Sequence, residues 1–574
     1  MDEVSLVWAI YFAFLALTVV VLPSNMKVQG LLLLTFVFAI PLLCRLGARL
    51  IGWRLFRTTK ARSDAILATR KREDEGHVEK QRVLSKSEDA DWVEVESHPA
   101  GSAPNGGQAS DEWDGIVGFL HPFCNAGGGG ERVLWAAIKA TQKRWPNAIC
   151  VVYTGDHDAT KPTILERVAQ RFNIHLHPPT VIFLYLQTRN LVLPSTWPHF
   201  TLLGQSLGSL VMAYDAFSLL VPDIFIDTMG YSFTLAFCKL LFPKIPTGAY
   251  VHYPTISTDM LSSLDAESGK GVNAGTGKGF RGFAKRQYWH AYASLYSLSG
   301  RNVDVVMTNS SWTQAHIQSL WGPKRTKRRK PHAVEVVFPP VAVDELEEAI
   351  DLDGPKAVLR EKSLLYVAQF RPEKNHDLIL RSFAGMLQAD LRDAKLVLVG
   401  SVRDDDDRKK VYALRLLAHD LKIEDNVQFA CDAPWPEVLN WLRKSWIGVN
   451  GMWNEHFGIG VVEYQAAGLI CVVNDSGGPK ADIVIDYDGG PTGMLSRRSV
   501  HLSVVLTLTA GFHANTASEY AASFAQAFSM SEEATLEMRK RARASSKRFT
   551  EEMFAKKWVE QLDKLIDIQR RAPK

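Results

Sequence analysis

The stretch EHFGIGVVE, residues 455–463, places two carboxylates eight positions apart around a glycine-rich turn. The β-branched run 447–450 before it predicts a strand, and the run 461–467 that it opens predicts a helix. A helix that starts directly after such a turn presents unpaired backbone amides and the positive end of its dipole to a bound anion. The stretch therefore predicts a strand–turn–helix unit with a phosphate site at the turn.

The two carboxylates of this stretch can recognise hydroxyl groups. Glu455 in the turn and Glu463 in the helix can each accept hydrogen bonds from a sugar. A nucleotide sugar offers a diphosphate, a ribose diol and a hexose with hydroxyls. A capping glutamate and a solvated helical glutamate would produce the same pair, so the neighbouring motifs have to decide between these readings.

A second motif, YVAQFRPEKN at residues 366–375, follows another predicted strand and contains two cations. Arg371 and Lys374 stand just past that strand, where a departing diphosphate would need charge neutralisation. This motif favours the nucleotide-sugar interpretation over the structural one.

A third motif, HPFCNAGGGGER at residues 121–132, follows the first predicted strand of the chain. Its four glycines, 127–130, let the backbone approach a ligand closely, and the next helix supplies its amino terminus. Alone the motif is a weak signal. It lacks the register of the dinucleotide fingerprint, and residues 271–279 are no P-loop because Lys278 is followed by glycine.

Short β-branched runs alternate with longer amphipathic stretches along most of the chain. The first series of predicted strands is 115–120, 148–153, 224–227, 247–252, 304–308 and 333–338, and the second is 363–368, 395–399, 427–430, 447–450 and 470–474. Two such series predict two parallel doubly wound sheets, with a junction at the prolines 339–340 and the acidic stretch 344–353. Ligands bind beyond the carboxyl ends of such strands, where all three motifs stand.

Together with the turn Gly477-Gly478-Pro479, these motifs resemble the retaining glycosyltransferases of family 4. The segments HYP (252–254), QFRPEKNH (369–376) and NEHFGI (454–459) resemble, within that family, the α-1,2-mannosyltransferases of the endoplasmic reticulum in asparagine-linked glycosylation. The resemblance covers roughly residues 114–570. The usual arginine a few positions before the lysine corresponds here to Gln369, and Arg371 is the candidate replacement.

The resemblance implies an α/β protein of the GT-B class, with two Rossmann-like domains facing across a cleft. Residues 114–345 would form the acceptor domain and 346–530 the nucleotide-sugar domain, while 531–574 would form a helix crossing back to the first domain. The implied reaction moves mannose, with retention, from GDP-mannose to a dolichol-diphosphate-linked trimannosyl-chitobiosyl acceptor, adding the fourth and fifth mannoses. Two alternatives stay open: a family 4 enzyme with another nucleotide sugar or lipid acceptor, and an inactive GT-B scaffold, which the presence of the charged motif residues disfavours.

The resemblance also implies roles for individual residues. Lys374, Arg371 and the amides near Gly458 would stabilise the diphosphate, Glu455 would position the mannose hydroxyls, and Glu463 would hold the ribose. His252 could face the donor sugar and the acceptor hydroxyl, although a lone histidine is as often structural. The implied catalytic residues are Glu455, Glu463, His252 and Lys374; the donor contacts are Arg371, Lys374, Glu455, Phe457, Gly458, Ile459, Glu463, Gly128 and Gly129; the acceptor contacts are His121, Gly127, His252 and Tyr253.

No metal or other cofactor is expected. The acidic run 404–407 lies between Arg403 and Arg408 and is more typical of a solvated turn than of a ligand set. The six cysteines lie far apart without a CxxC, which argues against a zinc site or a disulfide scaffold.

The amino end predicts a membrane anchor over residues 1–60, with one or two transmembrane helices. Residues 4–22 carry no charge, and about 20 helical residues cross a bilayer. Residues 30–44 form a second apolar run, and the arginines and lysines from Arg45 to Arg62 place the flank in the cytosol by the positive-inside rule. An interfacial helix is the alternative. The polar composition of residues 61–113 predicts a linker.

A net charge of +4 over 574 residues disfavours a nucleic-acid binder that relies on bulk electrostatics. The expected partners are GDP-mannose, a dolichol-diphosphate-linked oligosaccharide and the membrane, with other mannosyltransferases of the same pathway as further candidates. The expected location is the endoplasmic reticulum membrane, with the catalytic domains on its cytosolic face. The basic run 324–330 is either a solvated loop or a contact for anionic lipids, and the apolar stretch 207–242 packs a core or lies on the bilayer.

Overall fold

The computed structural model describes residues 40–84, 113–264, 279–327, 332–353, 359–388, 393–487, 490–491 and 511–572. The apolar run 4–22, most of the run 30–44 and residues 85–112 of the predicted linker lie outside this part of the chain. Within the described residues, no helix combines the length and the hydropathy that crossing a membrane requires. The anchor over residues 1–60 therefore remains a prediction.

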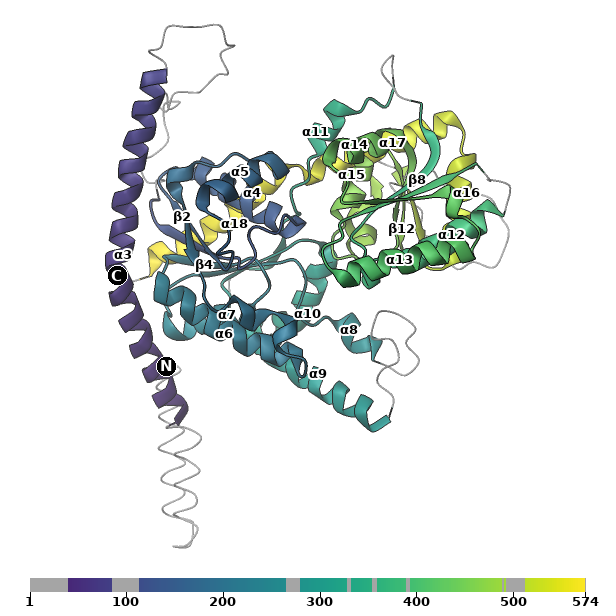
Figure 1. The fold of residues 1–574 in the computed structure, drawn as a ribbon. Helices are drawn as coiled ribbons and strands as arrows, with labels where there is room; N and C mark the ends of the chain where they lie inside the picture. Colours follow the sequence, from purple (N-terminus) through teal and green to yellow (C-terminus); the bar gives the residue numbers. More distant parts are fainter. Residues whose placement is uncertain are drawn as a thin grey trace.

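The first domain is built on a parallel sheet, as the alternating pattern predicts, with seven strands where six were expected (Figure 1). Its strands are β1 (Ile116–Leu120), β2 (Ile149–Thr154), β3 (Val181–Tyr185), β4 (Ile224–Asp227), β5 (Thr247–Val251), β6 (Val305–Thr308) and β7 (Val334–Val336). They run in the order β3-β2-β1-β4-β5-β6-β7, so the winding direction reverses between β1 and β4. Ligands bind at such a reversal, beyond the carboxyl ends of the strands.

The second domain repeats this plan with a six-stranded parallel sheet. Its strands are β8 (Glu361–Val367), β9 (Lys395–Gly400), β10 (Val427–Cys431), β11 (Ser445–Asn450), β12 (Ile470–Asn474) and β15 (Gly511–Ala514). The order β10-β9-β8-β11-β12-β15 puts the reversal between β8 and β11. A separate antiparallel pair joins β13 (Asp486–Tyr487) and β14 (Gly490–Pro491).

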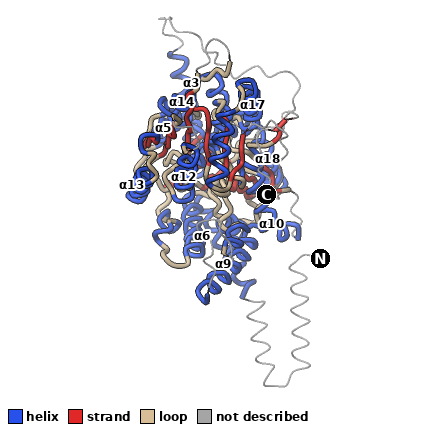
Figure 2. The backbone as a smooth tube through the Cα atoms, turned by 90° about the vertical axis from the view of Figure 1, so that its right-hand side faces the viewer, coloured by secondary structure: helices blue, strands red, loops and turns tan. Residues whose placement is uncertain are grey.

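Helices cover both faces of each sheet, which explains why the central strands are buried along most of their length. The first domain has α4 (Gly129–Arg144), α5 (Lys161–Phe172), α6 (Thr201–Leu219), α7 (Ser232–Leu241), α8 (Thr258–Ser263), α9 (Gly279–Gly300) and α10 (Ser311–Lys327). The second has α11 (Val343–Ala349), α12 (His376–Leu387), α13 (Asp405–Asp420), α14 (Trp435–Lys444), α15 (Ile459–Ala467), α16 (Ala517–Ser529) and α17 (Glu532–Ser546). Figure 2, which looks onto the second domain, shows its strands enclosed by these helices.

Four hydrophobic cores follow from this layering, one on each face of each sheet. In the first domain, α4 and α5 enclose one core and α6, α7, α9 and α10 the other. In the second domain, α12, α13 and α16 enclose one core and α11, α14 and α15 the other. The apolar stretch 207–242, which includes β4, α7 and most of α6, thus contributes mainly to the first-domain core.

The carboxyl-terminal segment differs in detail from the single helix predicted over 531–574. It is divided into α17, a short turn at Lys547–Phe549, and α18 (Glu551–Arg571), and only α18 packs on the first domain. Trp558 of α18 is fully buried there, and its indole N–H donates to Oγ1 of Thr141, 3.1 Å away. The crossover to the first domain therefore begins after Phe549.

The boundary predicted at residue 60 falls inside a helix. α3 (Ile40–Leu84) continues through the first part of the expected linker and packs on α6 and α7. The residues after 60 are rich in alanine, arginine, lysine and glutamate, which are strong helix formers even where they bury little surface. Arg62 ties this part down by donating to the Leu219 carbonyl oxygen, 2.7 Å away.

Part of the basic run 324–330 is also structured, because α10 extends to Lys327. Arg325 is buried, and its guanidinium donates to the carbonyl oxygens of Val303, Asp304 and His332. This cation therefore stabilises the fold instead of facing solvent or lipid, while residues 328–330 lie outside the described chain.

Candidate active site

The loops at the carboxyl ends of both sheets surround one cavity of about 740 Å³. The first domain contributes the glycine loop after β1 and His252 after β5. The second domain contributes Lys374 after β8, Glu455 after β11 and the glycine turn that opens α15. All three sequence motifs therefore meet at one place, as the parallel topology predicts.

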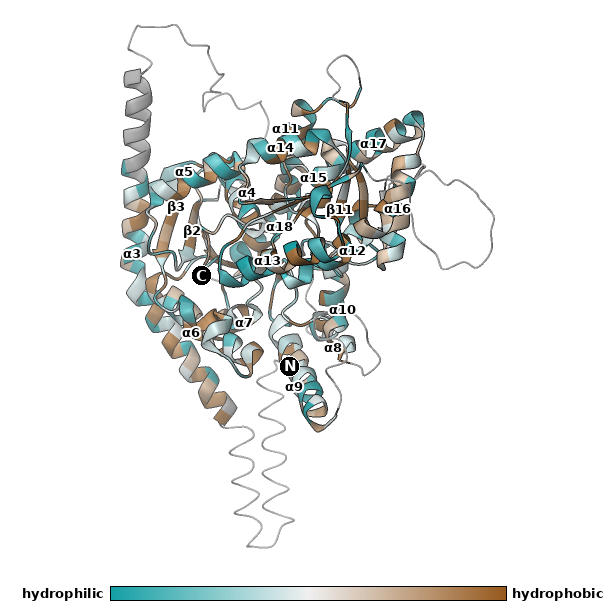
Figure 3. Cartoon of the chain, turned by 45° about the vertical axis from the view of Figure 1, so that its right-hand side comes forward, coloured by the Kyte–Doolittle hydropathy of each residue, from teal (hydrophilic) through white to brown (hydrophobic). Residues whose placement is uncertain are grey.

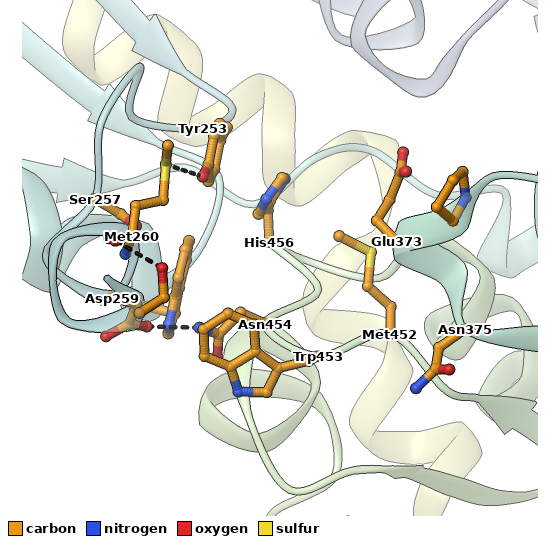
Figure 4. Close-up of a pocket in the computed structure, with 13 residues that line it drawn as sticks. Tyr253, Ser257, Asp259, Met260, Glu373, Asn375, Met452, Trp453, Asn454 and His456 are labelled. Atoms are coloured by element: carbon orange, nitrogen blue, oxygen red, sulfur yellow. Dashed lines mark hydrogen bonds between the residues drawn. The ribbon is translucent and has the colours of Figure 1, made fainter. Parts of the chain in front are cut away.

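A second cavity of about 500 Å³ adjoins the first and also lies between the domains (Figure 4). Tyr253, Trp312 and Trp453 supply aromatic rings, and Asp259 and Asn454 supply polar groups. The amide of Asn454 donates to the Asp259 carboxylate at 2.6 Å, which links the two domains across the cavity. His456 lines both cavities, so the second opens beside the first.

Lys374 and Glu455 form an ion pair in the larger cavity. The Lys374 ammonium lies 2.5 Å from Oε2 of Glu455, and the Asn450 amide donates to the same oxygen at 3.3 Å. Burial by itself would raise the pKa of Glu455, but the charge of Lys374 and the contribution of His456 outweigh burial and hold this pKa below its ordinary value. The Glu455 carboxylate is therefore charged at neutral pH.

The turn at residues 477–478 holds the backbone of Glu455 in place. The backbone N–H of Gly478 donates to the Glu455 carbonyl oxygen at 2.7 Å, and the backbone N–H of Asn454 donates to Oγ of Ser476 at 2.7 Å. Gly477 has φ +68°, and a Cβ atom there would collide with the Glu455 carbonyl oxygen. Only glycine permits this close approach, which fixes where the Glu455 carboxylate can reach.

Two helices start at the cavity, one from each domain. α15 begins after Gly458, whose φ of +104° is suited to glycine, and α4 begins after Gly128. The two starts are close, since a Cβ atom on Gly129 would lie 2.6 Å from Cδ1 of Ile459. Both helix dipoles thus place positive ends at the same site.

The glycine loop of the first domain is partly satisfied from within. The Glu131 carboxylate accepts hydrogen bonds from the amides of Gly127 and Gly128. Those two amides are therefore already engaged in this structure, which differs from the simple phosphate cradle expected of them. Arg171, which the sequence motifs did not single out, lies beside Gly127 and lines the cavity.

His252 lines the larger cavity beside Gly130. Its Nε2 is buried and has no hydrogen-bond partner among the described residues. Burial, together with the nearby His456, lowers the pKa of His252 to about 4. The imidazole is therefore neutral at pH 7, with one ring nitrogen available to a substrate hydroxyl.

Glu463 lies on α15 but is not among the side chains that line either cavity. Burial raises its pKa, and the charge of Arg132 on α4 opposes this shift. The Nε atom of Arg132 is itself buried without a hydrogen-bond partner in the described chain. The two residues come from different domains and interact electrostatically at their junction.

Three other predicted residues occupy positions that the motifs did not reveal. His121 is buried with Nδ1 2.7 Å from Oγ1 of Thr228, and burial lowers its pKa to about 3; it lines neither cavity. Arg371 is half-exposed beside Glu373 and lines neither cavity, whereas Gln369 lines the larger one. Phe457 touches the larger cavity but packs mainly on Phe338 and Phe549.

Tyr253 belongs to the second cavity, where its ring stacks on His456 with centroids 3.9 Å apart. Its hydroxyl donates to Sδ of Met260 at 2.7 Å. Trp312, Trp453, Asp259 and Asn454 beside it were not found from sequence. Asp259 and Trp312 lie at the starts of α8 and α10 in the first domain, and Trp453 and Asn454 lie in the loop after β11 of the second, so only the tertiary packing brings them together.

The acidic run 404–407 forms a helix start. The Asp404 carboxylate accepts a hydrogen bond from the Asp407 amide at 2.9 Å and caps α13. Asp405 and Asp406 pair with Arg408 and Lys409 on the exposed helix surface. The helix-cap arrangement agrees with the interpretation of a solvated turn, and the metal-free reaction remains a prediction.

Two doubly wound domains that bring glycine-capped helix starts to one cavity define the GT-B class of fold. Solved structures show the same fold: a UDP-forming α,α-trehalose-phosphate synthase from Burkholderia xenovorans is 12% identical with a TM-score of 0.54, covering 79% of this chain and 99% of that one. A glycosyltransferase from Rickettsia africae is 14% identical with a TM-score of 0.51, at 79% and 99% coverage.

Sequence comparison specifies the family. Residues 114–321 match the ALG11 mannosyltransferase N-terminus, and residues 349–499 match the glycosyl transferases group 1. A Neurospora crassa GDP-Man:Man(3)GlcNAc(2)-PP-Dol alpha-1,2-mannosyltransferase is 56% identical over 92% of this chain and 94% of its own length. The Homo sapiens protein of that name is 44% identical over 79% and 87%. The chain belongs to the family of GDP-Man:Man(3)GlcNAc(2)-PP-Dol alpha-1,2-mannosyltransferases.

Proposed function

We propose that this chain is a retaining α-1,2-mannosyltransferase that moves mannose from GDP-mannose onto a dolichol-diphosphate-linked trimannosyl-chitobiosyl acceptor, adding the fourth and fifth mannoses. The observation that carries this proposal is the Lys374–Glu455 ion pair, which stands between two glycine-capped helix starts in one cavity. The names of the relatives in both fungi and animals support the donor and the acceptor.

The donor would lie in the larger cavity. As the bond between the mannose anomeric carbon and the diphosphate breaks, negative charge grows on GDP and is stabilised by Lys374 and the amino end of α15. Glu455 would accept hydrogen bonds from the mannose hydroxyls, because a charged carboxylate can only accept. Gly128, Gly129, Gly458 and Ile459 would let the diphosphate approach the backbone of both domains, and Glu463 near Arg132 would hold the ribose.

The acceptor would lie in the adjoining aromatic cavity. His252 and Tyr253 are consecutive residues after β5, and His252 lines the larger cavity while Tyr253 lines the second. The acceptor 2-hydroxyl could therefore reach the anomeric carbon near His252. Its oxygen would form the new bond on the face from which the diphosphate departs, and its proton would pass to the departing diphosphate oxygen, which leaves GDP and the extended oligosaccharide as products.

Catalysis is proposed to need no metal. Lys374, Arg171 and two helix starts supply positive potential around the site of the diphosphate. Activity in excess EDTA that equals activity without EDTA is the expected result. A loss that Mg²⁺ or Mn²⁺ restores would contradict this part of the proposal.

Residues 1–60 are proposed to hold the chain in the endoplasmic reticulum membrane, with the catalytic domains on the cytosolic face. The uncharged run 4–22 and the cations that follow residue 44 support this arrangement. Other mannosyltransferases of the same pathway are proposed partners. Protease accessibility of both domains in sealed microsomes would be the expected result, and protection of the domains would reject the orientation.

A direct assay tests the activity. Full-length protein in detergent is incubated with GDP-[³H]mannose and a synthetic phytanyl-diphosphate-linked trimannosyl-chitobiose, and UDP-sugars are supplied as competing donors. Transfer of one or two α-1,2-linked mannoses from GDP-mannose is expected. Preference for a UDP-sugar would identify another family 4 activity, and no transfer from any donor would favour the inactive scaffold.

A further inference from the structure

A third cavity, of about 410 Å³, forms a groove on the first domain. It lies between the start of α6 and the amino-terminal half of α9, with Met260 of α8 at one side. Its lining is mostly apolar and includes one cation; it consists of Phe200, Thr201, Leu202, Met260, Ala284, Lys285, Tyr288 and Trp289. Figure 1 shows α6, α8 and α9 together along the lower edge of the molecule.

The groove adjoins the aromatic cavity of the candidate active site, which in turn adjoins the larger cavity. Met260 lines both the groove and the aromatic cavity, and His456 lines both the aromatic cavity and the larger one. Figure 4 shows Met260 and His456 on opposite sides of Tyr253. The three cavities are therefore neighbours, with the groove at one end and the cavity of the Lys374–Glu455 pair at the other.

Exposed aromatic side chains surround the groove. Phe200, Phe280 and Phe283 are 68%, 86% and 58% exposed, although a clustered set of large apolar groups is unfavourable in water. Arg281, Lys285 and Arg286 lie between or just after the phenylalanines of α9, and Lys285 stands 5.1 Å above the Trp289 ring. Figure 3 shows hydrophobic and hydrophilic residues mixed along α9 at this edge. Such a mixture of aromatic and cationic groups suits the boundary between lipid and phosphate.

We propose that this groove binds the first isoprene units of the lipid-linked acceptor, with Lys285 beside the diphosphate. The inference rests on the proposed function and extends it to the lipid part of the substrate. An isoprenoid-diphosphate oligosaccharide presents an apolar chain, then two negative charges, then sugars. The protein presents an apolar groove that contains one cation, Lys285, and beside it the aromatic rings and the Asp259–Asn454 pair, so each part of the acceptor has a chemically matching neighbour.

The central experiment enlarges one exposed residue of the groove. Ala284 is a small, exposed side chain on α9, so Ala284→Trp fills the groove without changing the core. Ala291→Trp, on an exposed alanine of the same helix outside the groove, is the matched control. Equilibrium binding of phytanyl diphosphate to the full-length protein in detergent is measured, because this probe carries the lipid and the diphosphate without sugar.

Ala284→Trp should weaken phytanyl diphosphate binding by about tenfold or more, while Ala291→Trp should stay within about twofold of wild type. Lys285→Glu should weaken phytanyl diphosphate binding more than phytanol binding, because phytanol lacks the charges that the cation attracts. Inorganic diphosphate, as a separate probe, should compete weakly, since most of the binding would come from the apolar chain. If Ala284→Trp binds phytanyl diphosphate as tightly as the wild type does, the proposal is overturned. The same conclusion holds if the substitution changes only the oligomeric state and leaves this binding unchanged.

A kinetic arm separates this inference from the function on which it rests. Ala284→Trp should raise KM for the phytanyl-linked trimannosyl acceptor and leave KM for GDP-mannose unchanged. If the wild-type protein transfers no mannose but binds phytanyl diphosphate in a manner sensitive to Ala284→Trp, the proposed function fails and the lipid site stands. If transfer is normal and the variant shows neither defect, the groove is not the lipid site and the function stands.

Discussion

The Lys374 ammonium lies 2.5 Å from the Glu455 carboxylate, and the loops that carry the two residues follow strands β8 and β11, which are neighbours in the second sheet. The winding direction of the sheet reverses between these strands, so the two loops diverge and leave room for a ligand. The ion pair is therefore a direct product of the sheet topology. It places a cation for a diphosphate next to an anion for hydroxyl groups.

Glu455→Gln tests whether the negative charge of this pair is required. The amide keeps the shape of the side chain but cannot serve as a charged acceptor for two mannose hydroxyls, and it leaves Lys374 without its partner. We expect kcat/KM for GDP-mannose to fall by about 100-fold or more. Glu437→Gln, on an exposed glutamate of α14, should leave kinetics unchanged. Full activity of Glu455→Gln would remove Glu455 from the site.

Lys374→Met tests the electrostatic balance at Glu455. In the wild type, burial favours a raised pKa, and the charge of Lys374 is the largest effect that opposes it. The carboxylate therefore stays charged well below neutral pH. Without the lysine, burial should raise the Glu455 pKa. On acidification, the variant should therefore lose the charged form of Glu455 at a higher pH than the wild type does.

The measurement is kcat/KM from about pH 8 to about pH 5.5, normalised to each protein at pH 8. Over this range the wild-type profile should show no loss that is due to Glu455, while the Lys374→Met profile should decline toward acid. Lys409→Met, which removes an exposed lysine paired with Asp406, should follow the wild type. Parallel profiles for Lys374→Met and the wild type would show that Lys374 does not control the ionisation of Glu455.

Much of the fold could be predicted from the sequence, because buried parallel strands are short β-branched runs between turn residues. The strands 224–227 and 470–474 were predicted with the bounds that the structure has. β15 was missed because Gly511–Ala514 contains no β-branched residue. The helical part of the expected linker, residues 61–84, was missed because its polar composition was weighed above its helix propensity.

Site residues were predictable where they lie in the loop that follows a strand, as Lys374 does after β8 and Glu455 does after β11. The aromatic cavity was not predictable, because Trp312 and Trp453 come from different domains and meet only through packing. The positions of His121 and Arg371 also depend on packing. A motif places a residue near a strand end, but the surrounding side chains decide whether it faces the cavity.

Gly477→Ala tests the backbone support of Glu455 without touching a substrate group. A Cβ atom at this position would collide with the Glu455 carbonyl oxygen, and φ +68° is unfavourable for alanine. Glu455 should shift, and kcat should fall by about tenfold or more, because small displacements of a positioning group are costly. Gly322→Ala, where the structure leaves open space within 4 Å, is the matched control. Equal activity of the two variants would contradict a positioning role for the turn.

Trp558→Ala tests the attachment of α18 to the first domain. The indole is fully buried, stacks on Phe119 and Phe554, and donates a hydrogen bond to Thr141. Its removal should lower the free energy of unfolding by about 3–5 kcal/mol, as measured by denaturant titration. Lys557→Ala, on the adjacent exposed side chain, should change stability by less than about 0.5 kcal/mol. A small effect of Trp558→Ala would mean that α18 contributes little to the first-domain core.

His252→Ala tests whether a neutral imidazole assists the transfer step. Burial, with the nearby His456, lowers the pKa of His252 to about 4, so the ring is uncharged at neutral pH and its buried Nε2 faces the larger cavity without a partner in the described chain. We expect kcat to fall by about 10- to 100-fold while KM for GDP-mannose changes by less than about threefold. His252→Gln retains a neutral hydrogen-bonding group and should recover part of the activity.

Because the folded histidine does not take up a proton until well below its ordinary pKa, the wild-type rate should show no step near about pH 6.5 that His252→Gln removes. A step of that kind, or wild-type kcat in His252→Ala, would exclude the neutral imidazole from the reaction.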